Sequence, residues 1–107
     1  MNYWVIDTKV KILPESTFVL DGSDYYYTRS VVPSNEEDSE IVVSELHDFL
    51  KRKSIVLEQI LAVEKYENKT WDADKDEDFE TQESLLASKK TGEISLGCIV
   101  SELSIEE

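Results

Sequence analysis

The chain has 107 residues and a formal net charge of −13, from 24 acidic and 11 basic side chains. A chain of this length can build one hydrophobic core, so we expect a single domain over residues 1–107. Its 40% hydrophobic residues argue against a disordered chain. The negative charge argues against direct binding to nucleic acid or to an anionic membrane, and it favours basic proteins as partners.

The N-terminal third has the pattern of β-structure. Residues 1–13 alternate between apolar and charged side chains, which predicts a half-buried strand with Trp4, Ile6, Val10 and Ile12 on one face. Residues 17–20 and 25–32 flank a turn signal at Asp21 and Gly22, so they predict a hairpin. Pro33 would close its second arm, because proline cannot donate to a ladder.

The clearest helical pattern follows. Ser34 and Glu37 have the spacing of a capping box, which predicts that a helix begins there. The predicted helix has one apolar stripe and a basic C-terminal end at residues 51–53. The stripe consists of Val42, Val43, Leu46, Phe49 and Leu50.

Residues 54–67 fit a helix and a strand almost equally well. At helical spacing their apolar side chains spread around most of the helix, and at the two-residue spacing of a strand both faces are apolar. We interpret them as a buried central strand, with a continued helix as the alternative. A second helix is predicted through residues 85–87, ending at Gly92, and a last strand over 93–101 with Ile94, Leu96, Cys98 and Val100 on one face. These elements predict an α+β domain with a mostly antiparallel sheet of four or five strands and one or two packed helices.

The acidic stretch at residues 71–83 carries seven carboxylates and one lysine, which a folded domain tolerates only on a solvated face. We interpret it as a protein-binding surface with two apolar anchors. The candidate contact residues are Trp71, Asp72, Asp74, Asp76, Glu77, Asp78, Phe79 and Glu80. A second acidic cluster at Glu36, Glu37 and Asp38 either belongs to the same surface or is a separate solvated helix N-terminus.

Calcium binding is an alternative for the acidic stretch. Six acids from Asp72 to Glu83 occupy the ligand positions of a twelve-residue EF-hand loop. Glu77, however, stands where that loop needs glycine for its sharp turn. A solvated acidic loop is the competing interpretation, and we predict no metal site.

No residue set predicts catalysis. His47 is the single histidine and Cys98 the single cysteine, which excludes a zinc site of the usual structural kind, and nothing in the sequence positions the two as a nucleophilic pair. The sequence also lacks a glycine-rich phosphate loop. We therefore expect a protein that is not an enzyme and needs no cofactor.

Cellular location follows from cysteine usage and from the start of the chain. A lone cysteine cannot form an internal disulfide, so a reducing compartment suits the protein. No signal peptide or membrane span is visible. We expect a cytoplasmic protein.

A short, strongly acidic chain that opens Met1-Asn2-Tyr3-Trp4-Val5-Ile6 resembles the immunity proteins of bacterial polymorphic and contact-dependent growth inhibition toxin systems. The resemblance implies a cytoplasmic antitoxin that binds a basic toxin domain, often a nuclease, and covers its active site. No functional residue carries over from it. An alternative with the same chemistry is a nucleic-acid mimic that inhibits a restriction or CRISPR enzyme.

Overall fold

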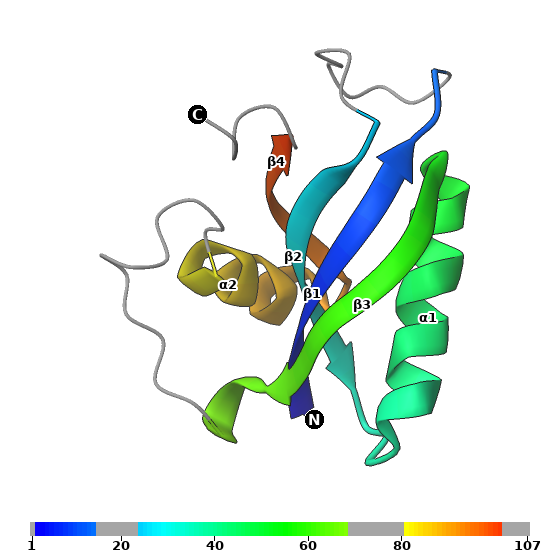
Figure 1. Cartoon of the computed structure of the whole chain (residues 1–107). Helices are drawn as coiled ribbons and strands as arrows, with labels where there is room; N and C mark the ends of the chain where they lie inside the picture. The colour runs from blue at the N-terminus through cyan, green and yellow to red at the C-terminus, as the bar shows by residue number, and fades with distance from the viewer. Residues whose placement is uncertain (1, 15–23, 69–80, 102–107) are drawn as a thin grey trace.

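The protein folds into a four-stranded antiparallel sheet with one helix on each face, across residues 2–14, 24–68 and 81–101, which the computed structural model describes (Figure 1). The sheet order is β3-β1-β2-β4. In chain order the elements are β1 (Asn2–Ile12), β2 (Tyr26–Ser34), α1 (Ser39–Arg52), β3 (Ile55–Lys65), the 3₁₀ turn η1 (Tyr66–Asn68), α2 (Thr81–Thr91) and β4 (Ser95–Ser101). The α+β prediction is confirmed.

The core follows from the alternation of β1. Its predicted apolar face packs against the stripe of α1, where Val42, Leu46 and Leu50 are fully buried. On the opposite face, Val5 of β1 and Val31 of β2 lie opposite each other in the ladder and pack against Leu85 of α2.

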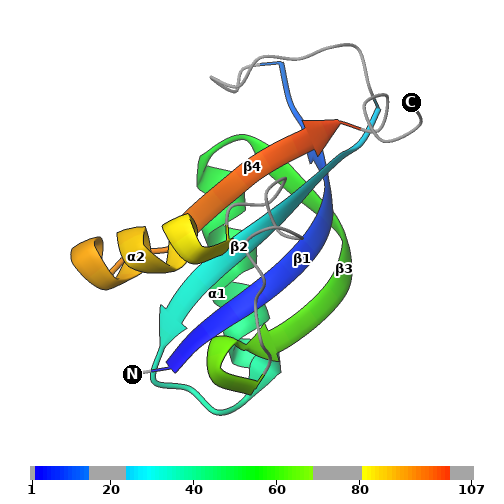
Figure 2. The ribbon, with the colours of Figure 1, turned by 90° about the vertical axis from the view of Figure 1, so that its left-hand side faces the viewer.

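The two helices cover different halves of the sheet. α1 packs mainly against β3, whereas α2 packs against β2 and β4 on the other face. Figure 2 shows the four strands side by side with α1 behind them. Each face of the sheet is therefore covered over only part of its width.

The prediction for the start of α1, with Ser34 as the N-cap, was wrong by four residues. The helix begins at Ser39, and its N-cap is Asp38, whose Oδ1 accepts a hydrogen bond of 2.9 Å from the Glu40 amide. Ser34 belongs to β2, and its Oγ accepts from the Glu36 amide at 3.1 Å. The capping-box spacing was present, but the antiparallel pairing of β2 with β1 extends through Ser34 and continues past Pro33.

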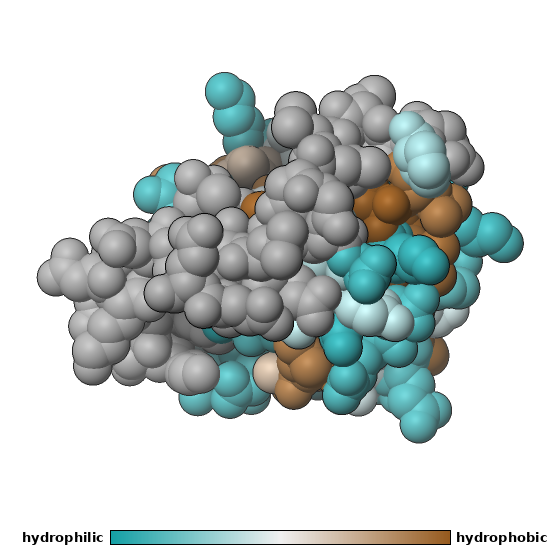
Figure 3. Space-filling model, turned by 45° about the horizontal axis from the view of Figure 1, so that its top comes forward, coloured by the Kyte–Doolittle hydropathy of each residue, from teal (hydrophilic) through white to brown (hydrophobic). Residues whose placement is uncertain are grey.

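Residues 55–65 form a strand as predicted, but β3 is an edge strand of the sheet and not a central one. Two register shifts against β1 leave Glu58 and Leu61 as the extra residues of β-bulges. Val56 and Leu61 are 40% and 48% exposed, so these two apolar side chains of β3 meet solvent. On the side where β3 and α1 lie, hydrophilic residues separate the apolar patches (Figure 3).

Two further strand predictions need correction. The arm predicted over residues 25–32 pairs with β1 on one side and β4 on the other, so β1 is its hairpin partner; residues 17–20 lie outside the described part. In β4 a register shift follows Leu96. It places Ile99 on the α1 face with Leu96, and Val100 on the opposite face.

The second helix was predicted correctly. α2 ends at Thr91, and Gly92 follows with a φ of +74°, the left-handed conformation that glycine adopts most readily. The Gly92 amide donates a hydrogen bond of 2.8 Å to the Ser88 carbonyl. No glycine follows α1; the left-handed residue there is Ser54, with a φ of 61°.

Candidate functional site: the acidic end of the sheet

Eight of the eleven predicted contact residues, Trp71 to Glu80, lie in residues 69–80, outside the part of the chain that the structure describes. The structure does show where the chain enters and leaves this stretch. Tyr66 of η1 packs against the cluster of Val5, Val31 and Leu85. The entry point therefore lies on the α2 face of the sheet.

The exit from the acidic stretch is fixed on the same face. Thr81, the first residue of α2, is fully buried, and its Oγ1 accepts a hydrogen bond of 3.1 Å from Arg29 Nη1. Arg29 also makes a bidentate ion pair with Asp7, at 2.6 Å from Nε to Oδ1 and 2.9 Å from Nη2 to Oδ2. One arginine on β2 therefore joins β1, β2 and the start of α2.

The three acids of the second predicted cluster, at residues 36–38, have different surroundings. Asp38 caps α1. The Glu37 carboxylate accepts hydrogen bonds from Lys65 Nζ and, at 2.9 Å, from Asn2 Nδ2. Lys65, and then Asn2, hold the pKa of Glu37 below its ordinary value, because both hydrogen bonds favour the charged carboxylate. The exposed Glu36 has no ion-pair partner among the described residues.

The contact between Glu37 and Lys65 joins the acidic cluster at residues 36–38 to the end of β3. Lys65 is the last residue of β3, and the chain continues through η1 directly into residues 69–80. Residues 36–38 thus lie beside the entry to the acidic stretch. Sequence reasoning missed Lys65, which lies 28 positions from its partner and belongs to a different element.

The first turns of α1 extend the acidic surface. Glu40 and Ile41 are exposed there, and Ile41 keeps 44% of its surface accessible. The stripe of Val42, Leu46 and Leu50 faces the sheet, and position 41 falls off it at helical spacing. An isoleucine just outside a complete apolar stripe was the signal that could have identified this exposed side chain.

Of the two residues weighed for chemistry, the structure describes the side chain of His47, on the exposed side of α1. The His47 side chain is half exposed, with Nδ1 at 4.0 Å from Asp48. Within the described ranges, no group of three potential ligands could hold a metal ion. The side chain of Cys98 lies outside the described part.

The EF-hand frame requires a helix before its loop. The described residues that precede the acidic stretch form the strand β3 and one 3₁₀ turn. Glu83, which would be the last ligand of the frame, is exposed in the first turn of α2. Among the residues described before position 69, the helix–loop–helix geometry of the calcium hypothesis therefore lacks its incoming helix.

Comparisons give no relatives for this fold: no protein-family model, curated protein or solved structure matches the chain. No helix in the described ranges is both long enough and apolar enough to cross a membrane.

Proposed function

We propose that the chain is an acidic protein-binding inhibitor, an immunity protein that binds and neutralises a basic toxin domain in the cytoplasm. The observation that supports this most is the contact between Glu37 and Lys65, which places the acidic N-terminal region of α1 beside the entry to residues 69–80. The acids at 36–38 therefore lie close to the residue after which the chain continues toward the second acidic region.

A toxin nuclease holds phosphate groups with lysine and arginine, so carboxylates can occupy the same groove. The principal contacts in this proposal are the acids between Asp72 and Glu80, with Trp71 and Phe79 as anchors. Glu36 and Glu40 form the rim of this surface together with Ile41. Glu37 has a different part, because its carboxylate already binds Lys65 and holds the region in place.

Charge complementarity accelerates encounter and weakens with salt, whereas buried apolar anchors slow dissociation. The proposed inhibitor therefore captures its target through the acidic surface and retains it through the aromatic residues and Ile41. The partner is a protein with a basic active-site groove, and one copy of the inhibitor covers one groove.

A pull-down from lysate of the source organism, washed at low and then high salt, tests the proposal. One basic protein retained at a fixed ratio, and released by salt, is the expected result. The activity of the retained protein identifies the class of target and distinguishes a toxin from a restriction or CRISPR enzyme. Retention of many abundant basic proteins without a fixed ratio would contradict the proposal.

Charge reversal then locates the surface. The double variant Glu36→Lys/Glu40→Lys should weaken binding at least tenfold at low salt. The matched control is Asp24→Lys/Glu58→Lys, which changes the net charge equally at two other exposed positions and should lose much less affinity. Equal losses in both variants would mean that only the total charge matters. Circular dichroism must show both variants folded, because lysine near a helix N-terminus is unfavourable.

A further inference from the structure

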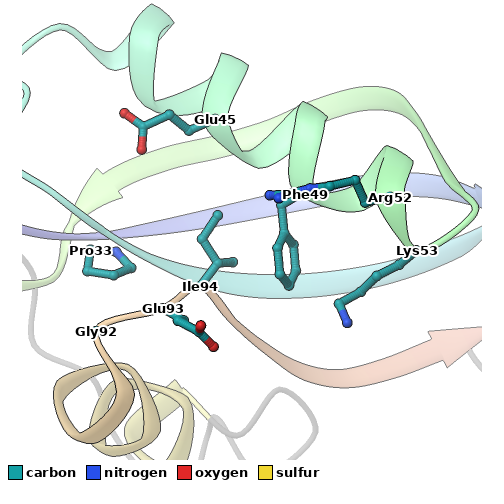
Figure 4. Close-up of a pocket in the computed structure, with 8 residues that line it drawn as sticks. All are labelled: Pro33, Glu45, Phe49, Arg52, Lys53, Gly92, Glu93 and Ile94. Atoms are coloured by element: carbon teal, nitrogen blue, oxygen red, sulfur yellow. The ribbon is translucent and has the colours of Figure 1, made fainter.

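A groove of about 470 Å³ lies between α1 and the residues that lead into β4, away from the α2 face where the acidic stretch begins and ends (Figure 4). It exists because α1 packs mainly against β3 and α2 covers the opposite face of β2 and β4. The α1 side of β2 and β4 is therefore incompletely covered. The volume is in the range of sites that bind a ligand or a short peptide segment.

The middle of the groove is apolar. Phe49 extends from α1 toward the start of β4, and Ile94 extends toward α1 from the opposite wall (Figure 4). Both side chains are partly buried and pack at the border of the main core. Apolar surface that remains accessible between two rigid elements favours an occupant with an apolar side chain of its own.

The charges of the groove are separated along α1. Figure 4 shows Glu45 on the α1 wall and Glu93 on the opposite wall, with Ile94 between them, and Lys53 farther along the groove beyond Phe49. Arg52 also lines the groove from α1, and its side chain extends along the helix in the direction of Glu45 (Figure 4). The end with Glu45 and Glu93 therefore fits a cation, and the end with Lys53 fits an anion.

These charges remain available for an occupant. Neither Glu93 nor Arg52 forms an ion pair with any described residue. Glu45 accepts a 3.3 Å hydrogen bond from Ser34 Oγ, a neutral donor. The Lys53 ammonium lies 5.1 Å from the centre of the Phe49 ring and forms no ion pair with a described carboxylate.

We propose that this groove binds an extended peptide segment of the partner, in which an apolar residue lies between a basic and an acidic one. Glu45 and Lys53, the C-cap residue of α1, are eight positions apart, or about 12 Å along the helix axis. Three to four residues of an extended chain span about the same distance. The segment therefore carries its two charges about three to four residues apart, the cation toward Glu45 and Glu93 and the anion toward Lys53.

This inference rests on the proposed function, since the segment belongs to the same partner. The groove provides specificity that net charge cannot, because it recognises an order of charges along a chain. A partner that is basic overall but lacks the segment would be attracted to the acidic surface and would dissociate faster.

The test uses the full chain and a library of randomised seven-residue peptides displayed on phage. Selection should enrich peptides with a basic and an acidic residue around an apolar one. Chemical-shift changes on binding should centre on Phe49 and Ile94. The variant Lys53→Glu/Glu93→Lys reverses one charge at each end and leaves the net charge unchanged, so it should weaken these peptides at least tenfold. The control Glu58→Lys/Lys90→Glu, at exposed positions outside the groove, should leave their affinity unchanged.

Several results would overturn the proposal. One is the absence of enrichment, and another is equal affinity of the selected peptides for the wild type and the groove variant. Shift changes centred on Glu36 and Glu40 would assign peptide binding to the acidic surface. A wild-type dimer that dissociates in the groove variant would assign the groove to a second copy of the chain. None of these results would affect retention of a basic partner in the pull-down, so failure of the groove proposal is distinguishable from failure of the proposed function.

Discussion

Arg29 should contribute more to stability than any surface arginine, and Arg29→Met tests this directly. The substitution keeps much of the apolar length of the side chain and removes the guanidinium. Asp7 then loses two charge-assisted hydrogen bonds, and Thr81 loses one. Methionine can form none of these hydrogen bonds, so the Asp7 carboxylate and the buried Thr81 hydroxyl lose the guanidinium as a donor.

The magnitude follows from how far the ion pair is shielded. Exposed ion pairs contribute about 0 to 1 kcal/mol, whereas removing one partner of a fully buried pair costs about 3 to 5 kcal/mol. The side chains of Arg29 and Asp7 are 14% and 26% exposed, so the pair lies between these limits. We expect Arg29→Met to lower the free energy of unfolding by about 2 kcal/mol, or the melting temperature by roughly 10 °C for a domain of this size.

Urea unfolding followed by tryptophan fluorescence measures the change. The matched control is Arg52→Met, the same chemical change at an exposed arginine without an ion pair among the described residues, and it should cost less than about 0.5 kcal/mol. A double-mutant cycle with Asp7→Asn should give a coupling of at least about 1 kcal/mol. Equal destabilisation by the two arginine substitutions, or a coupling near zero, would refute the assignment of Arg29 as the link between sheet and α2.

Three other predictions concern single groups. Ser30 and Ser88 are both fully buried, but Ser30 Oγ has no hydrogen-bond partner in the described chain, whereas Ser88 Oγ donates to the Val31 carbonyl. Ser30→Ala should therefore leave the free energy of unfolding unchanged or raise it, and Ser88→Ala should lower it by about 1 kcal/mol. Equal effects of the two substitutions would contradict this difference. Carboxyl chemical shifts should show that the pKa of Glu37 lies below its ordinary value, and Lys65→Met should raise that pKa. Because the pKa is depressed in the folded state, the ion pair stabilises the protein at neutral pH, and this stabilisation is lost as the pH falls through the lowered pKa. Gly92→Ala should cost about 1 kcal/mol in thermal unfolding, although the space around Gly92 is open, because alanine is strained at positive φ; no loss would mean that the helix end readily adopts another conformation.

Some residues specify local structure whatever surrounds them. The alternation over residues 2–12 identified the face of β1 that became the core, because side chains in a strand point to opposite faces in turn. The glycine after Thr91 identified the end of α2 for a similarly local reason, since left-handed backbone favours glycine. The start of α1 was less certain, because both Ser34 and Asp38 are good N-cap residues.

The candidate site was predictable only in part. The sequence marked the acidic residues at 36–38 and 71–80 from composition alone. It did not show that Glu37 binds Lys65, that Asp38 caps a helix, or that Ile41 is exposed beside them. These facts depend on which elements lie next to one another, and residue spacing along the chain carries no such information.

By itself, the sequence determined the fold class, the buried face of β1, the second helix and the concentration of negative charge. Tertiary structure alone decided that β3 lies at the edge of the sheet and that Arg29 joins two strands to α2. It also decided that the two helices cover different halves of the sheet, which leaves the groove beside Phe49. The physical reason is that periodicity fixes which face of an element is apolar, whereas strand order depends on the packing of all elements together.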